Sequence, residues 1–263
     1  VKRITIIGNE AFSDKKLKGL MTTNEAGALS VLTQSGKFNE FVFQNDLAVL
    51  MSHYFDNGYI NADVLDSRVL LSEDRRSFLV TIAISEGEQY RAGKIDATGD
   101  LLYPKEELTA KIKLATGDVF SRSALSKGLE GISTAYGDKG YAYAEVRPLT
   151  KVNPNDKTID ITVNIKQNEL VYVERIDLSG NVRTRDKVIR REVEVAEGGL
   201  YSATELKKSR DNLKRLGYFE DVRITEARGS ASDRVKLIVS VKERPTGSIS
   251  LGFGYSSVDK LIG

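Results

Sequence analysis

The stretch IDLSGNVRT, residues 176–184, has two counterparts earlier in the same chain. They are ITIIGNEAF at 4–12 and IDATGDLLY at 95–103, and each contains an isoleucine, three further residues, a glycine and then Asn or Asp. Glycine followed by Asn or Asp favours a turn that needs a positive φ, which ends a strand. The chain therefore contains the start of one structural unit three times.

Two more markers recur after each of these starts. The first is Gly-Tyr followed by a run that reaches valine, as in DNGYINADV at 56–64, DKGYAYAEV at 138–146 and RLGYFEDVRI at 215–224. The second is an alternating apolar run: FLVTIAI at 78–84, TIDITVNI at 158–165 and RVKLIVSV at 234–241. Self-similarity at a regular period indicates a repeat architecture. We therefore predict three domains, at residues 1–88, 90–168 and 170–244.

Each copy carries the start and stop signals of two helices between its first and second strands. The residues that precede the first helices are Ser13, Pro104 and Thr184, and those that precede the second helices are Asn39, Ser121 and Ser202. Such residues favour helix N-termini. In the first copy an apolar stripe follows, formed by Phe43, Leu47, Leu50, Met51 and Tyr54. A glycine that can form a left-handed C-terminal cap stands at the expected end of each second helix: Gly58, Gly140 and Gly217.

The predicted unit is β-α-α-β-β, with one apolar stripe per helix to cover one sheet. The fold class is α+β: three tandem domains, each a three-stranded mixed sheet covered by two helices. The third strand has the most regular apolar alternation, as in Val235, Leu237, Val239 and Val241, so we place it in the centre of the sheet. The second strand then becomes an edge, with a row of unpaired N–H and C=O groups.

Composition excludes several classes of protein. Among 263 residues, 40% are hydrophobic and 29% charged, and no apolar run is long enough for a transmembrane helix. Without cysteine there are no disulfides, thiolate zinc sites or cysteine nucleophiles. A net charge of +2 with interspersed signs argues against nucleic-acid binding. The chain opens on Val1 without a leader, and we expect it to be a trimmed piece of an exported protein.

The sequence contains no convincing catalytic, cofactor or metal site. His53 is the only histidine, which rules out a cluster of imidazole ligands, and we expect it to be structural or to lie on the surface. GEQYRAGKI at 87–95 has five residues between its glycines and lacks the Ser or Thr of a phosphate-binding loop. GFG at 252–254 is too short for a dinucleotide fingerprint. We therefore expect a binding protein rather than an enzyme, with no cofactor.

The unit order, the I-x-x-x-G-N and L-x-x-x-G-Y motifs, and the closing VKERPTG at 241–247 together resemble the polypeptide-transport-associated (POTRA) domains of outer-membrane β-barrel assembly proteins. The resemblance covers essentially the whole chain. The middle copy departs from the pattern with Asp100 in place of Asn, which suits the same turn. In this family five POTRA domains are usual, so the resemblance makes these copies the third, fourth and fifth. The extra loop at 26–37 fits a longer third domain.

In the same family the last POTRA domain leads directly into a membrane barrel. Residues 245–263 are then a linker and a truncated barrel strand, because SISLGFGYS at 248–256 alternates apolar and small residues. The resemblance implies the periplasmic region of a Gram-negative outer-membrane protein, joined to the membrane through a barrel that this chain lacks. It implies unfolded outer-membrane proteins as clients and the lipoproteins of the barrel assembly complex as partners.

Two sets of residues are the predicted binding sites. An edge strand can bind an extended client by β-augmentation, and the candidates on the second strand of the first copy are Ile60, Asp63, Val64 and Ser67. The same strand resembles the edge where family members dock a β-propeller lipoprotein. Glu197 and Arg244 match positions that resemble the docking face for a helical-repeat lipoprotein. For the strand residues the alternative is that they only complete the local sheet. For Glu197 and Arg244 the alternative is surface charge that contributes little.

Two other functions stay open on the sequence alone. A POTRA-containing scaffold of a related translocation or secretion system would join its machinery without binding unfolded clients, and covered strand edges would favour it. A hydrolase acting on cell-wall polymer would need converging acidic residues in a pocket, which the sequence does not indicate.

Overall fold

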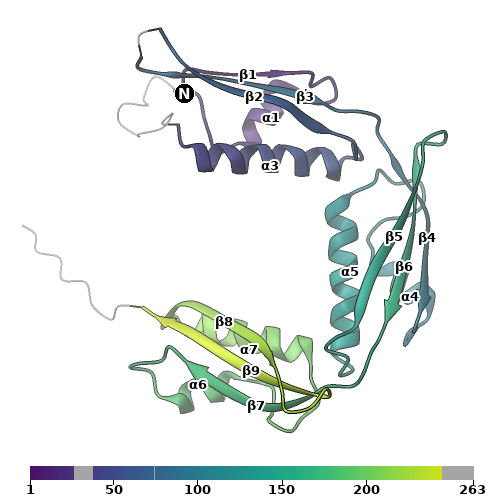
Figure 1. Cartoon of the computed structure of the whole chain (residues 1–263), viewed down its shortest axis with the longest axis vertical. Coiled ribbons are helices and arrows are strands. Elements are labelled where there is room, and N and C mark those ends of the chain that lie inside the picture. The colour runs from purple at the N-terminus through teal and green to yellow at the C-terminus, as the bar shows by residue number, and fades with distance from the viewer. Residues whose placement is uncertain (27–37, 74, 245–263) are drawn as a thin grey trace, which may run out of the picture. The chain divides into compact units, whose positions relative to one another are not determined.

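The computed structural model describes residues 1–26, 38–73 and 75–244 (Figure 1). These residues form three sheets of three strands, each with helices against one face, and we call them the first, second and third modules. The predicted α+β fold of three tandem units is thereby confirmed. Val1–Tyr136 and Tyr143–Asn168, which include the first two sheets, form one compact unit; Gly137–Ala142 and the described residues from Glu169 form another.

The first module consists of β1 (Arg3–Ile7), α1 (Asp14–Leu20), α3 (Glu40–Asp56), β2 (Asp63–Leu71) and β3 (Phe78–Ser85). Its helices begin at the predicted caps: the side chains of Ser13 and Asn39 accept hydrogen bonds from Lys16 N and Val42 N. The predicted stripe on α3 is confirmed, since Phe43, Leu50 and Tyr54 are buried in the core of this module.

The second module consists of β4 (Arg91–Gly99), α4 (Lys105–Ala110), α5 (Arg122–Gly137), β5 (Glu145–Asn153) and β6 (Thr158–Lys166). The third consists of β7 (Tyr172–Ser179), α6 (Asp186–Glu192), α7 (Ala203–Arg215), β8 (Phe219–Arg228) and β9 (Arg234–Glu243). Ser121 and Ser202 cap the longer helices as predicted, accepting from Ala124 N and Glu205 N. Pro104 directly precedes α4, as predicted. The cap residue of α6 is Arg185 rather than the predicted Thr184, so this helix begins one residue later than predicted.

All three sheets have the predicted topology. The strand orders are β1-β3-β2, β4-β6-β5 and β7-β9-β8, so the last strand of each module is central. It pairs in parallel with the first strand and antiparallel with the second. The side chains of β9 that were predicted to be apolar and central, Val235, Leu237, Val239 and Val241, are all buried. The second strand of each module is therefore an edge within the described part of the chain.

Glycine is required where the first strand of each module ends. Gly8, Gly99 and Gly180 have φ values of 86°, 96° and 84°. A Cβ atom on any of them would lie 2.0–2.1 Å from the carbonyl oxygen of the central strand, at Ile84, Ile165 or Val241. No side chain fits at that distance. The glycine that marked the repeat in the sequence thus allows the turn to approach the central strand closely.

Some predictions fall outside the described residues. These are the linker and barrel strand at 245–263 and, apart from Ala26, the extra loop at 26–37. The domain limits predicted from the repeats also remain predictions. No helix in the described ranges has the length and apolar character needed to cross a membrane.

Candidate protein-binding site

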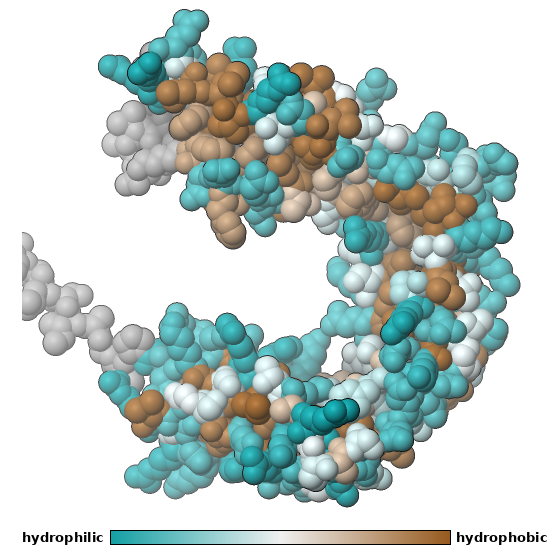
Figure 2. Space-filling view, viewed as in Figure 1, coloured by the Kyte–Doolittle hydropathy of each residue, from teal (hydrophilic) through white to brown (hydrophobic). Residues whose placement is uncertain are grey.

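The edge strand β2 is accessible along much of its length. β2 pairs only with β3 among the described residues, and its register shifts between Val64 and Asp66, which indicates a β-bulge at Leu65. Leu65 and Leu70 are 69% and 61% exposed. Figure 2 shows hydrophobic side chains gathered over this module. Exposed leucines on an edge strand are suited to contact another polypeptide.

The predicted edge residues are only partly brought together. Val64 and Ser67 pair with Ile84 and Ile82, both buried, so their side chains lie on the helix-facing side of the sheet. Asp63 is exposed, and its Oδ1 atom accepts a hydrogen bond from Val64 N at 2.9 Å. The placement of Ile60 on this strand was wrong, because β2 begins at Asp63. Ile60 N instead donates to Gly58 O, in the turn that follows α3.

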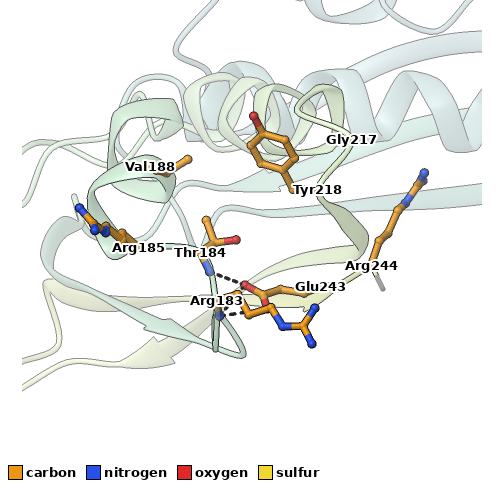
Figure 3. A pocket seen from close by; sticks show the side chains of 8 residues that line it. All are labelled: Arg183, Thr184, Arg185, Val188, Gly217, Tyr218, Glu243 and Arg244. Atoms are coloured by element: carbon orange, nitrogen blue, oxygen red, sulfur yellow. Dashed lines mark hydrogen bonds between the residues drawn. The ribbon is translucent and has the colours of Figure 1, made fainter. Parts of the chain in front are cut away.

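A pocket of ≈ 540 Å³ lies on the third module and includes the predicted residue Arg244. Figure 3 shows its lining, which is formed by Arg183, Thr184, Arg185, Val188, Gly217, Tyr218, Glu243 and Arg244. The backbone N–H and Nε of Arg244 donate to Tyr218 O and Phe219 O, at 2.8 and 3.1 Å. These bonds fix the stem of Arg244 at the end of β9.

The one carboxylate among the described residues that line this pocket accepts hydrogen bonds from backbone amides. Glu243 accepts hydrogen bonds from Thr184 N at 2.7 Å and from Arg183 N at 3.1 Å (Figure 3). The bond from Thr184 N is the main cause that lowers the pKa of Glu243 below its usual range. Glu243 therefore stays ionised at neutral pH. With three arginines and a single carboxylate in its lining, the pocket is basic.

Glu197 does not line this pocket, so the structure does not bring the two predicted docking residues into one site. Its carboxylate accepts from Ile176 N at 2.8 Å, next to a register shift in β7, and from Arg190 at 3.3 Å. The bond from Ile176 N is the main cause that lowers the pKa of Glu197. Glu25 binds Ile4 N and Lys18 in the same way in the first module. Glu197 thus has a structural role that the sequence did not reveal.

His53 is partly buried and packs against Phe12 in the first module, in agreement with the structural or surface role expected for it. Its ring lies 4.7 Å from that of Phe12, and its backbone oxygen accepts from Asn57 Nδ2 at 2.8 Å. Burial, and then the positive charge of Lys16, lower the pKa of His53 below 6.5. Across the described residues, no three His, Asp or Glu side chains are grouped so that they could hold a metal ion.

The stability of the first module should decrease as the pH falls below about 6.5, the pKa of an unfolded histidine. Because the folded pKa of His53 is lower, the unfolded chain binds the proton more tightly. The contribution of neutral His53 to the stability of the module is therefore fully present above the pKa of the unfolded histidine and is lost progressively as the pH falls below it. NMR titration of this single imidazole should give a midpoint below 6.5, and H53Q should remove the dependence between pH 7.5 and 5.5. A midpoint at or above 6.5 would contradict this assignment.

Comparison with known proteins agrees with the geometry of the three modules. The profile of the POTRA family, described as "Surface antigen variable number repeat", matches residues 1–87, 90–168 and 171–244. The chain is 34% identical over 250 residues to the outer membrane protein assembly factor BamA of Neisseria meningitidis, covering 94% of this chain and 31% of the relative. It is 31% identical to BamA of Nitratidesulfovibrio vulgaris, covering 98% of this chain and 33% of the relative.

A solved structure gives the same result. The crystal structure of Haemophilus influenzae BamA POTRA3-5 superposes with a TM-score of 0.79 at 27% identity, covering 91% of this chain and 94% of that one. The chain spans about a third of the length of the curated relatives it matches. The predicted location is confirmed, because the POTRA region of BamA is the periplasmic part of an outer-membrane protein. Three matches to one family profile, on three sheets of one topology, show that this chain belongs to the POTRA family.

Proposed function

We propose that the chain is the client-receiving and scaffold region of an outer-membrane protein assembly machine. Its edge strands pair with extended segments of unfolded β-barrel proteins and pass them to a membrane barrel for folding and insertion. Pairing through main-chain groups tolerates many sequences, as a receptor for many clients requires. The role is one of binding rather than catalysis, in keeping with relatives that are named as assembly factors.

The observation that carries this proposal is the accessible edge of β2. Its leucines at positions 65 and 70 are exposed, and β3 occupies only one of its two sides. Natural proteins usually protect such an edge with lysine, proline or a covering element. β2 contains no lysine or proline, and its only protecting features are the bulge at Leu65 and charged side chains such as Arg68. An edge with so little protection favours use in binding.

Docking of lipoprotein partners is the second part of the proposal. The β2 strand, with Asp63, Val64 and Ser67, would also receive a β-propeller lipoprotein, and Ile60 would contribute from the preceding turn. The basic pocket around Arg244 would receive a helical-repeat lipoprotein through acidic side chains, because its arginines outnumber its carboxylates. Glu197 would contribute to that docking only if its bonds to Ile176 and Arg190 were exchanged for bonds to the partner.

The double variant L65K/L70K should bind an unfolded β-barrel protein about tenfold more weakly than the natural chain. Lysine on an edge strand opposes the addition of another strand, and the two substitutions also remove exposed apolar contact. A loss of about 1.4 kcal/mol corresponds to tenfold in affinity. Fluorescence anisotropy of a labelled unfolded barrel protein, diluted from denaturant into the full chain, measures the effect.

The matched control is F41K/V182K, which adds the same two charges at positions that are 84% and 91% exposed and belong to α3 and to the third module rather than to β2. It should leave the affinity within about twofold, the change expected of surface substitutions worth less than about 0.5 kcal/mol. Equal affinities for the two double variants would contradict client capture at β2. Absence of any binding by the natural chain would favour the scaffold of a related translocation or secretion system.

A further inference from the structure

A mostly apolar groove lies beside the edge strand of the second module, where the start of α5 meets the end of α3. The groove has a volume of ≈ 290 Å³ and is lined by Phe55 and Ile60 of the first module and by Phe120, Arg122, Leu125, Thr150, Val152 and Ile159 of the second. Thr150 and Val152 belong to β5 and face the helices, since they pair with the buried residues Ile161 and Ile159. The groove therefore lies beside the edge of β5, at Thr150 and Val152 rather than at Pro148, which has no N–H to offer a further strand.

The third module closes the equivalent position. Glu226 on β8 pairs with Leu237, as Thr150 on β5 pairs with Ile161. Tyr201 precedes the cap of α7, as Phe120 precedes the cap of α5. The hydroxyl of Tyr201 donates to Glu226 at 2.6 Å and so bridges the helix cap and the edge strand. Phe120 has no hydroxyl and Thr150 is short, so the second module lacks this bridge.

The first module fills its equivalent position with an aromatic ring. Phe78 pairs with Leu71 at the start of β3, as Ile159 pairs with Val152 in the second module. Phe38, which precedes the cap of α3, lies 5.1 Å from the ring of Phe78 and 5.7 Å from that of Phe43. Ile159 is smaller than phenylalanine and leaves space beside Phe120. In the second module, Phe120, Thr150 and Ile159 thus leave this position open, and Phe55 and Ile60 of the first module complete the groove.

We propose that this groove holds an apolar side chain of an extended client segment paired with the edge of β5. The proposal rests on the proposed function and adds to it an anchoring position on the second module. A strand added to β5 would direct every second side chain toward the helix layer, where the groove lies. The described lining is mostly phenylalanine, leucine, isoleucine and valine, and it contains no carboxylate. Its one charged side chain, Arg122, lies over the ring of Phe55 at 5.2 Å, so an aliphatic or aromatic side chain fits the groove best.

The opposite face of the same sheet indicates what the alternate client residues should be. There a hollow is lined by four charged residues, Lys94, Asp96, Lys151 and Asp160, together with Leu149, Thr150 and Thr162. Lys151 pairs with Asp160 across β5 and β6. Charged side chains favour small or polar neighbours on this face. The client that matches both faces therefore alternates an apolar residue with a small or polar one. This chemistry is that of a β-strand with one apolar face.

Two synthetic peptides test the inference with the full chain. Both alternate apolar residues with serine, and they differ only at the central apolar position, which is phenylalanine in one and serine in the other. We expect the natural chain to bind the phenylalanine peptide about tenfold more tightly, as measured by fluorescence anisotropy. F120Y/T150E, which introduces the closing pair of the third module, should reduce that ratio to about one.

Two further variants distinguish loss of the groove from misfolding of the module. V152R places the arginine of the third module, Arg228, at a partly exposed position of the groove and should also abolish the preference. L149S, on the other face of β5, should leave the preference intact. Circular dichroism checks that each variant is folded.

The outcomes separate this inference from the proposed function. Binding of both peptides with equal affinity would overturn the anchoring groove and leave edge capture standing. A preference that survives in both F120Y/T150E and V152R would also overturn the groove. Failure of the natural chain to bind either peptide would contradict capture of extended clients, and with it the inference.

Discussion

Replacement of Gly99 by alanine is expected to destabilise the second module by about 3 kcal/mol or more. A non-glycine residue with positive φ costs about 1–2 kcal/mol, and Gly99 has a φ of 96°. The added Cβ would also lie 2.0 Å from Ile165 O, so β4 or the turn after it must move away from the central strand. That movement weakens the parallel pairing of β4 with β6 and adds to the cost.

Amide hydrogen exchange of β6 measures this effect, because it reports the opening of one module without the assumption that the whole chain unfolds in one step. G117A is the matched control in the same module: Gly117 has a φ of 93°, but its Cβ would meet nothing within 4 Å. G117A should reduce the stability of the module only through the unfavourable positive φ, by about 1–2 kcal/mol. G19A, in α1 and with open space around it, should be neutral or stabilising by up to about 1 kcal/mol. Equal losses of stability in G99A and G117A would contradict the view that the close approach to Ile165 requires glycine at this turn.

Removal of the Asp46 carboxylate should destabilise the first module by about 3 kcal/mol. Asp46 lies on α3, is fully buried, and accepts hydrogen bonds from Thr22 N at 2.7 Å and Thr23 N at 2.8 Å. In D46A both amides lose their acceptor just after α1. A buried donor left without a partner costs about 1–3 kcal/mol. The two losses and the cavity left by the side chain account for the expected total.

D46N is the matched variant, because asparagine has the same shape and keeps one of the two acceptor oxygens. It should cost about half as much as D46A, since one of the two amides retains an acceptor. Exchange rates of the β3 amides report both changes. A cost below about 1 kcal/mol for D46A would contradict the view that this carboxylate ties the end of α1 to α3.

The sequence predicted the features that depend on local chemistry. The glycines that end the first strands, the helix caps at Asn39 and Ser202, and the stripe of α3 each depend on residues close together in the chain. The sequence also placed β9 in the centre of its sheet, from the alternation of Val235, Leu237, Val239 and Val241. A central strand has a neighbour on each side, so its helix-facing side chains are all buried and all apolar.

Features that depend on long-range register could not be predicted. The bond from Ile176 N to Glu197 joins residues 21 positions apart, and a charged residue in VEVAEGG has no sequence signal for that role. The groove beside β5 requires Thr150 and Ile159, which the pairing of β5 with β6 brings together, to meet Phe120 and the first module's Phe55. Ile60 was misplaced because four residues, 59–62, separate Gly58 from the start of β2 at Asp63.

Residue-resolved amide exchange by NMR, with and without an unfolded β-barrel protein, tests the central claim most directly. If the open strand edges capture extended clients, amides of β2 and β5 should become protected when the client is added, while those of the central strands β3 and β6 change little. If the client binds but the amides of β2, β5 and β8 all exchange at unchanged rates, capture by strand pairing is contradicted.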